Sequence, residues 1–293
     1  MENNIEKGKI IKILGGFYYI YSKSRVIECR ARGSFRKDKI KPLVGDIADF
    51  RVPKNEDNLG YIENIHKRKN YLIRPPVSNI DQSIVVFSVR DPNPNFILLD
   101  KFIINSLKEK IEPIICINKI DLDEEKSLDI YNNYKKSGFK VILTSKEKDD
   151  TIVKLKNVLN NKTTVFAGPS GTGKSSLLNV VKPGLNLKTG EISQKLKRGK
   201  HTTRHVEMIE ISKNSWVVDT AGFSNLNLEG IDKYNLKDYY NEFNDYYCKF
   251  NDCLHDKEPG CEIIKGLDEG EISDLRYKNY IKILSEIKKE GSK

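Results

Sequence analysis

The chain has 293 residues, of which 38% are hydrophobic and 31% charged, and its formal net charge at pH 7 is +10. No run approaches the roughly 20 apolar residues that cross a bilayer, and the N-terminal segment is too polar for a secretory signal. These features argue against a membrane or secreted protein. They predict a cytoplasmic protein of two or three domains, at roughly 100–200 residues each, whose five cysteines are thiols or metal ligands.

The charge is unevenly distributed along the chain. Residues 1–70 have 16 Lys/Arg and 9 Asp/Glu, residues 71–226 have 24 and 17, and residues 227–293 have 11 and 15. A basic front and an acidic tail predict a polyanionic partner that is held mainly by the first two segments. Solubility alone would also explain such a balance.

Short apolar runs alternate with turn signals between residues 8 and 68. The predicted strands are 8–14, 17–21, 26–31, 44–52 and 60–65. Short, evenly spaced strands favour a small all-β barrel of the five-stranded OB type. Such barrels commonly bind nucleic acid, but one that only packs on its neighbour fits equally well, because a fold does not assign a function. Residues 67–76 are predicted to be a linker.

Strands and helices alternate from residue 83 onward. The predicted strands are 83–89, 111–117, 139–143 and 163–167, and the predicted helices are 95–110, 122–136 and 151–159. This alternation is typical of a parallel, doubly wound sheet.

A phosphate-binding motif follows the strand at 163–167. Residues 168–175 read G-P-S-G-T-G-K-S and fit G-x-x-x-x-G-K-[ST] at every constrained position. The glycines let backbone N–H groups surround the phosphates at the N-terminus of the next helix. Lys174 is predicted to reach the β- and γ-phosphates, and the Ser175 hydroxyl to bind Mg²⁺.

Two segments that follow other predicted strands indicate which nucleotide base is bound. Asn118-Lys119-Ile120-Asp121 has the form N-K-x-D, and Thr144-Ser145-Lys146 ends the next strand. The aspartate can accept hydrogen bonds from guanine N1–H and its exocyclic amine, whereas adenine would leave the carboxylate unpaired. The nucleotide is therefore predicted to be GTP.

Two segments after the phosphate loop have the form of nucleotide switches. Asp219-Thr220-Ala221-Gly222 matches D-x-x-G, so Asp219 is expected to hold Mg²⁺ through water and Gly222 to meet the γ-phosphate. A threonine of 199–204, Thr203 rather than Thr202, is expected to complete the metal shell. Residues 186–204 are predicted to be mobile, and their basic run to contact a polyanion.

Three cysteines and a histidine lie within fourteen residues of the tail, as Cys248-x4-Cys253-x-His255-x5-Cys261. Soft ligands of this number suit one structural, tetrahedral Zn²⁺. Reduced cysteines beside a solvated histidine are the alternative. Helices are predicted on either side, over 234–247 and 273–289.

The order of the motifs is unusual, because the base-recognition motifs precede the phosphate loop. All the loops can still meet at the carboxyl edge of one sheet, so a circularly permuted domain can assemble the site. With a preceding barrel, this order resembles the RsgA family (also called YjeQ or YloQ) of ribosome small-subunit biogenesis GTPases. Arg74-Pro75, residues 79–82 and Gly199-x-His201-Thr202-Thr203 support the resemblance, as does the spacing of the zinc motif.

The resemblance implies an OB barrel over residues 1–69, a circularly permuted GTPase domain over 70–226 and a helical zinc-binding domain over 227–293. It implies hydrolysis of GTP to GDP, stimulated by the 30S subunit late in its maturation, with 16S rRNA as a partner, and we expect a monomer. Phe223 follows D-x-x-G where many GTPases have a water-orienting glutamine, and His201 is the candidate substitute. A histidine beside a basic loop would equally suit contact with an RNA phosphate.

Two other functions remain compatible with the residues alone. One is a P-loop ATPase or kinase, in which N-K-I-D is accidental. The other is an RNA-binding scaffold with a vestigial nucleotide site.

The predicted site residues fall into four groups by role. Three are predicted to be catalytic: Lys174, His201 and Thr203. The residues predicted to bind GTP are Asn118, Lys119, Ile120, Asp121, Thr144, Ser145, Lys146, Gly168, Pro169, Ser170, Gly171, Thr172, Gly173, Lys174, Ser175, Ser176, Asp219 and Gly222. Mg²⁺ is predicted to be held by Ser175, Thr203 and Asp219, and Zn²⁺ by Cys248, Cys253, His255 and Cys261.

Overall fold

A computed structural model describes residues 5–31, 41–53, 59–73, 75–185, 187, 206–219 and 228–290. The chain forms two compact units, and each is described by itself. The first comprises Met1–Gln82, Val158–Phe166 and Glu191–Phe223; the second comprises Ser83–Asn157, Ala167–Gly190 and Ser224–Lys293. No helix of the described ranges is both long and apolar enough to cross a membrane.

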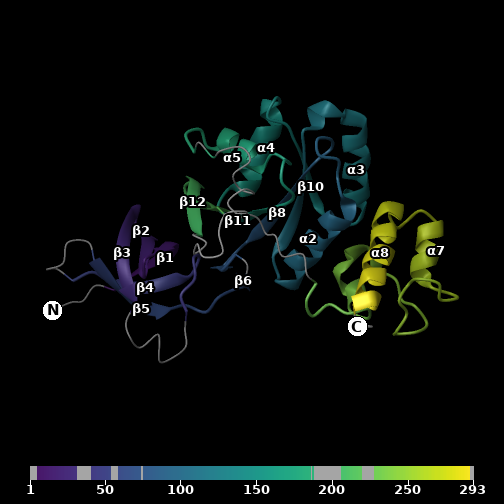
Figure 1. The fold of residues 1–293 in the computed structure, drawn as a ribbon, viewed down its shortest axis with the longest axis horizontal. Coiled ribbons are helices and arrows are strands. Elements are labelled where there is room, and N and C mark those ends of the chain that lie inside the picture. The colour runs from purple at the N-terminus through teal and green to yellow at the C-terminus, as the bar shows by residue number, and fades with distance from the viewer. Residues whose placement is uncertain are drawn as a thin grey trace. The chain divides into compact units, whose positions relative to one another are not determined.

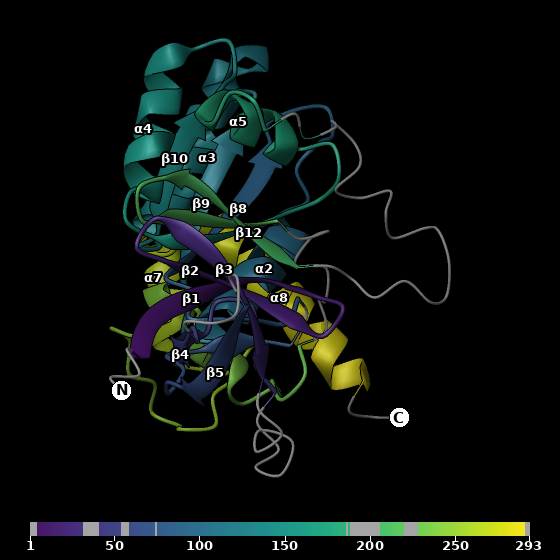
Figure 2. The same cartoon turned by 90° about the vertical axis from the view of Figure 1, so that its left-hand side faces the viewer.

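Five strands of the first unit form a closed barrel (Figure 1 and Figure 2). They are β1 (Ile5–Leu14), β2 (Phe17–Ser22), β3 (Arg25–Ala31), β4 (Ile47–Arg51) and β5 (Leu59–Ile65). Neighbouring strands pair antiparallel except β3 and β5, which are parallel, and β1 closes the barrel on β4. Gly15 and Gly16 both have positive φ, as the tight β1–β2 turn requires. The predicted barrel is confirmed.

The segment predicted to be a linker is tied to the barrel by a buried carboxylate. Asp46 is fully buried and accepts hydrogen bonds from Arg68 Nε at 2.8 Å and Ser78 Oγ at 2.6 Å. The short strand β6 (Tyr71–Leu72) of this segment pairs with β7 (Val77–Ser78), which follows the segment directly. Because a buried charge is costly without partners, the Asp46 contacts fix the path of the chain as it leaves the barrel.

Three more strands extend the sheet of the first unit beyond the barrel. β11 (Thr163–Ala167) pairs parallel with β13 (Ser215–Asp219), β13 pairs antiparallel with β12 (Glu207–Ser212), and β12 pairs antiparallel with β1. Side chains reinforce this junction: the rings of Tyr21 and Trp216 lie edge to face at 4.9 Å, and Lys9 Nζ donates to Thr163 Oγ1 at 2.9 Å. The barrel and the strands that carry the nucleotide motifs are thus hydrogen-bonded to each other.

The second unit has neighbouring strands in the order β10-β9-β8, with helices packed against them. The elements are β8 (Gln82–Ser88), α2 (Phe96–Lys108), β9 (Glu112–Asn118), the 3₁₀ turn η1 (Ile120–Leu122), α3 (Glu124–Lys136), β10 (Lys140–Thr144), α4 (Asp149–Leu159) and α5 (Lys174–Val181). Asn95 and Asp123 cap α2 and α3 by accepting from the backbone N–H three residues on, at 3.1 Å in both cases. All of the helices predicted here are present.

The C-terminal part of the second unit differs from its prediction. It contains the short 3₁₀ turns η2 (Leu236–Tyr239) and η3 (Asn241–Phe243) and the helices α7 (Glu262–Asp268) and α8 (Asp274–Glu290). The helix predicted over 234–247 was wrong, because the chain is extended at Tyr240 (φ −111°, ψ 90°). The rings of Tyr240 and Phe243 instead pack against Tyr280 at centroid distances of 5.0 and 5.1 Å. Tertiary packing decides the conformation of a segment this short.

A buried ion cluster joins α8 to α2. Arg276 is fully buried; its NH1 lies 2.5 Å from Asp100 Oδ1 and its Nε donates to Glu242 Oε1 at 2.8 Å. Asn279 Nδ2 donates to the other Asp100 oxygen at 2.9 Å, and the guanidinium lies 4.4 Å from the Tyr240 ring centroid. Buried charges persist only when paired in this way, so the cluster fixes the C-terminal helices to the sheet-bearing part of the unit.

We expect Arg276→Ala to lower the free energy of unfolding by about 3–5 kcal/mol, because it leaves two buried carboxylates without their cation. Urea denaturation measures this. Lys278→Ala is the control on the same helix, where the Lys278–Asp274 pair is exposed and contributes at most about 1 kcal/mol. A loss from Arg276→Ala no larger than that of the control would contradict the assigned role of the cluster.

Candidate functional site

The phosphate loop connects the end of β11 to the start of α5, as predicted. Its glycines are required by close approaches as well as by the backbone. A Cβ on Gly168 (φ 127°) would lie 2.0 Å from the Val86 carbonyl oxygen, and one on Gly173 (φ 93°) would lie 2.3 Å from Asn118 Nδ2. Only glycine fits such positions. The loop is therefore packed directly against β8 and the end of β9.

Lys174 lies inside the loop. Its side chain is buried, and Nζ donates to the carbonyl oxygens of Gly168 at 2.8 Å and Pro169 at 2.5 Å. Burial lowers the pKa of Lys174 to about 8. A phosphate in the loop would raise this pKa again, because an adjacent negative charge favours the ammonium form. The residue is placed to bind an anion.

Asn118 connects the base-recognition loops to the phosphate loop. Its Nδ2 donates to the Thr172 carbonyl at 2.8 Å, and its Oδ1 accepts from Thr144 Oγ1 at 3.1 Å. Three segments that are separate in the sequence thus meet at one buried amide. The structure brings Asn118, Thr144 and Thr172 together, at the ends of β9 and β10 and in the loop after β11.

Asp121 is held by a contact that the sequence did not reveal. Ser145 Oγ donates to Asp121 Oδ1 and accepts from the Glu147 backbone N–H at 3.0 Å. This chain of hydrogen bonds orients the carboxylate. Lys119 has a left-handed backbone (φ 60°), and its Nζ donates to the Asp91 carbonyl oxygen. The N-K-I-D loop is therefore positioned before a base arrives.

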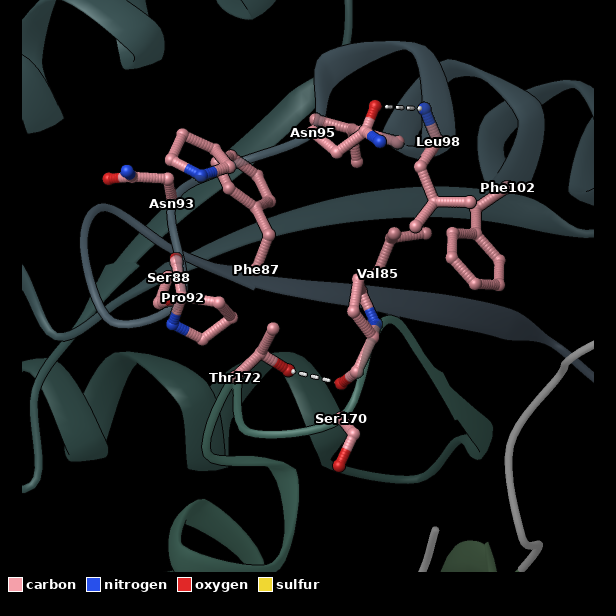
Figure 3. A pocket seen from close by; sticks show the side chains of 13 residues that line it. Val85, Phe87, Ser88, Pro92, Asn93, Asn95, Leu98, Phe102, Ser170 and Thr172 are labelled. Carbon is pink, nitrogen blue, oxygen red and sulfur yellow. Dashed lines mark hydrogen bonds between the residues drawn. The ribbon is translucent and has the colours of Figure 1, made fainter. Parts of the chain in front are cut away.

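The loop 90–95 was missed by the sequence analysis. Besides the Lys119 contact to Asp91, Arg90 pairs with Asp123 at 2.8 Å. The one feature of the sequence that could have indicated it is its position, because the polar run R-D-P-N-P-N directly follows a buried strand. The loop and the phosphate loop border a cavity of about 190 Å³ whose walls are mainly apolar (Figure 3). The lining includes Val85, Phe87, Leu98 and Phe102 from β8 and α2, and Ser170 and Thr172 from the phosphate loop.

We expect Gly173→Ala to lower nucleotide affinity at least tenfold, because the added Cβ would displace the Asn118 side chain from Thr172. Titration with a fluorescent guanine nucleotide measures this. Gly184→Ala is the matched control: Gly184 has the same φ of 93° but open space around its Cβ, so both variants carry similar backbone strain, of order 1–3 kcal/mol. Equal affinities for the two variants would contradict the role of the close approach.

Cys248, Cys253, His255 and Cys261 form a second predicted site, and all four ligand atoms lie within 4.8 Å of one another. Cys248 Sγ lies 3.7 Å from Cys261 Sγ, and His255 Nδ1 lies 3.5 Å and 3.3 Å from these two sulfurs. Tetrahedral zinc, with Zn–S about 2.3 Å and Zn–N about 2.0–2.1 Å, would set S···S near about 3.8 Å and S···N near about 3.6 Å. The donor set and its spacing fit such an ion.

The surroundings also suit a metal. Burial lowers the pKa of His255 to about 4, which leaves a neutral imidazole at neutral pH. The Glu258 carboxylate accepts from the backbone N–H groups of Leu254, Asp256 and Lys257 at 2.8–3.1 Å, which closes the loop between the ligands. Cys29 and Cys116 lie apart from this site as buried free thiols, and burial raises the pKa of each to about 12.

Several predicted residues lie outside the described part of the chain. These are His201, Thr203 and Gly222. Asp219 ends β13, and its side chain is not among those described. Their roles stay predictions.

Comparison with known proteins gives consistent matches over nearly the whole chain. The sequence model of the RsgA GTPase matches residues 65–229, and that of the RsgA N-terminal domain matches residues 7–62. The chain is 46% identical over 288 residues to a small ribosomal subunit biogenesis GTPase RsgA of Alkaliphilus metalliredigens, covering 97% of this chain and 99% of the relative. It is 47% identical to that of Bacillus pumilus, covering 96% and 97%.

Two crystal structures are similar in fold. One is YloQ, described as a circularly permuted GTPase, with a TM-score of 0.81, 38% identity and coverage of 98% of this chain and 96% of that one. The other is YjeQ from Thermotoga maritima, with a TM-score of 0.84, 35% identity and coverage of 97% and 99%.

Proposed function

The chain belongs to the RsgA family of circularly permuted small ribosomal subunit biogenesis GTPases, and from this premise we propose that it hydrolyses GTP on the 30S subunit late in subunit maturation. It is a GTP hydrolase. Contact with 16S rRNA through the barrel and the switch region is part of the proposal, as are a monomeric state, a place in the cytoplasm, and domains over residues 1–69, 70–226 and 227–293.

The observation that carries this proposal is the bond between Asn118 and Thr172, which ties the base-recognition loop to the phosphate loop. With Asp121 held by Ser145 at one end and Lys174 inside the loop at the other, one site has a group for each end of a guanine nucleotide. The guanine would donate to the Asp121 carboxylate. The Lys119 stem would lie over the purine, and a backbone amide of residues 144–146 would contact guanine O6.

The triphosphate would be held by residues 168–176 and by Gly222. Lys174 would bind the β- and γ-phosphates and stabilise charge that develops during hydrolysis. Ser175 and Thr203, with Asp219 through water, would hold Mg²⁺, which neutralises the phosphate oxygens when it is bound. Ser175 is buried in the first turn of α5, where the helix N-terminus also favours an anion.

His201 would orient the attacking water, because Phe223 stands where many GTPases have glutamine. We expect His201→Ala to lower turnover about a hundredfold, the low end for loss of a proton-handling group, with nucleotide affinity changed less than threefold. Single-turnover hydrolysis and nucleotide titration on the same preparation measure both quantities. Equal losses of turnover and affinity would assign His201 to binding instead.

The outer face of the barrel supports the proposed contact with rRNA. Arg30 lies over the Phe17 ring at 4.8 Å from its centroid, and Lys12 over the Tyr19 ring at 5.9 Å. Cations beside aromatic rings offer both a phosphate contact and a stacking surface for bases. The surplus of basic residues in 1–70 points the same way.

For the C-terminal cluster we propose one structural Zn²⁺, held by Cys248, Cys253, His255 and Cys261. Four protein ligands leave no open position, which is typical of a structural and not a catalytic zinc site. The ion would fix the loop between η3 and α7.

The proposal is tested by measuring GTP and ATP hydrolysis by the full chain, with and without purified small subunits, over a series of salt concentrations. We expect slow GTP turnover that small subunits accelerate, with the acceleration declining as salt rises, because basic residues hold RNA phosphates through salt-sensitive contacts. Equal use of ATP, or no response to small subunits at any salt concentration, would overturn it.

A further inference from the structure

Two aromatic side chains in the metal-binding loop point away from the protein core. Tyr247 is 86% exposed and Phe250 is 51% exposed. They flank Cys248 and Lys249 in the sequence, so both belong to the loop that carries the first ligand of the cluster. Large exposed aromatic residues that lie together mark interaction surfaces more often than chance.

Contacts of the neighbouring residues hold the loop backbone on which these exposed rings lie. Tyr246, the residue before Tyr247, donates a hydrogen bond from its hydroxyl to Glu271 Oε2 at 2.8 Å. Its ring also packs closely on Gly266 of α7, where an added Cβ would lie only 2.5 Å from a ring carbon of Tyr246. The following residue, Cys248, belongs to the Cys₃His cluster. Near Phe250, Lys237 Nζ donates to the Asn251 carbonyl at 2.8 Å. A ring carried on an ordered backbone loses less entropy on binding than one on a disordered segment, which makes it a better anchor.

Carboxylates lie near the rings in the sequence and around Tyr246, and one lysine lies over Phe250. Asp245 lies two residues before Tyr247, and the Glu271 carboxylate accepts a hydrogen bond from the Tyr246 hydroxyl at 2.8 Å, with Glu269 exposed two residues before Glu271. Lys249 lies over the Phe250 ring at 5.7 Å. Residues 227–293 as a whole have 15 acidic and 11 basic residues, in a protein whose net charge is +10. An RNA backbone would be repelled by this balance, whereas a lysine- or arginine-rich peptide would be attracted.

We propose that Tyr247, Phe250 and the neighbouring carboxylates form a docking surface for a basic protein segment exposed on the small ribosomal subunit. Its arginine or lysine side chains would stack on the two rings and pair with Asp245 and Glu269. This inference rests on the proposed function. In this arrangement the barrel contacts rRNA and the C-terminal loop contacts protein, so the two ends of the chain recognise different components of one particle.

The first test is the sign of a charge effect. We expect Asp245→Lys to weaken binding of the full-length protein to purified small subunits at least fivefold, because the new lysine would repel a basic protein segment. An RNA partner would instead bind the variant more tightly. Asp129→Lys on α3 is the control, because it makes the same change of charge at an exposed position elsewhere in the unit. Equal effects of the two substitutions, or tighter binding by Asp245→Lys, would overturn the proposal.

The second test identifies the component in contact. A photoreactive benzoylphenylalanine at position 247 of the full chain is cross-linked to small subunits, and the adduct is digested with ribonuclease or protease. We expect a ribonuclease-resistant adduct that carries a lysine- or arginine-rich peptide. An adduct on rRNA alone, or none while the particle binds normally, would overturn the inference.

A double variant, Tyr247→Ser with Phe250→Ser, links the rings to affinity. We expect it to lose at least tenfold in small-subunit affinity and to keep its GTP turnover in the absence of subunits, because both substitutions lie in the metal-binding loop and outside the nucleotide motifs. Unchanged affinity would contradict the inference. If the unmodified protein does not bind small subunits at all, the proposed function itself is wrong. If it binds and the double variant binds equally well, only the docking surface is wrong.

Discussion

Asp121→Asn is expected to lower GTP affinity about a thousandfold and to make XTP the better ligand. The carboxylate would accept two hydrogen bonds from guanine, and hydrogen bonds to a charged group contribute about 1.5–3 kcal/mol each. An asparagine places an NH₂ donor against guanine donors. Xanthine has a carbonyl oxygen in place of the guanine amine and can accept from that NH₂. Competition between GTP, XTP and a fluorescent guanine nucleotide measures both affinities.

Asp123→Asn is the matched control for this prediction. Asp123 lies two residues further along, where it caps α3 and pairs with Arg90. The same chemical change there should alter GTP affinity less than threefold and give no preference for XTP. If Asp121→Asn behaves like this control, Asp121 does not read the base.

The second large effect is expected at the metal cluster. Cys261→Ser should abolish stoichiometric zinc binding, because it removes one of the four ligands. The binding free energy of structural zinc in small domains is about 10–16 kcal/mol at neutral pH, and it depends on the complete set of ligands. Hydrogen exchange in residues 248–262 should then accelerate at least a hundredfold. Residues 163–166 of β11, which belong to the other unit, should keep their protection. Metal analysis and exchange mass spectrometry measure these quantities.

Cys116→Ser provides the control for the zinc prediction. Cys116 is a buried free thiol in β9, and its Sγ lies 3.2 Å from Thr144 Oγ1. This variant should keep one zinc per chain. Full zinc content in Cys261→Ser, or loss of zinc in Cys116→Ser, would contradict the assignment of the ligands.

The phosphate loop was predictable because it is a local pattern with a direct physical cause. Gly168 and Gly173 occupy backbone conformations and close approaches that exclude other residues, and Lys174 follows at the start of a helix. The strand before them was predicted over its full length, Thr163–Ala167, because every residue of it is buried. Contacts across the chain were not predictable in detail: Ser145 was predicted to lie at the nucleotide site, but the sequence does not indicate that its hydroxyl holds Asp121.

The C-terminal part was predicted less well because its structure depends on long-range contacts. The short helix α7 begins directly after a cluster ligand, Cys261, and has no periodic pattern long enough to indicate it. The helix predicted over 234–247 is absent, and two rings of this segment, those of Tyr240 and Phe243, pack against Tyr280 of α8. The buried pairing of Asp100 with Arg276 joins residues far apart in the sequence, and nothing local indicates it.

The central claim is that loops in a permuted order assemble one guanine nucleotide site. An experimental structure of the protein with a non-hydrolysable GTP analogue tests this most directly. The account predicts that the Asp121 carboxylate accepts from guanine N1 and N2 at about 2.7–2.9 Å, while Lys174 Nζ contacts the β- and γ-phosphates. A structure in which Lys174 holds the phosphates but the purine lies beyond hydrogen-bond reach of Asp121 would contradict it.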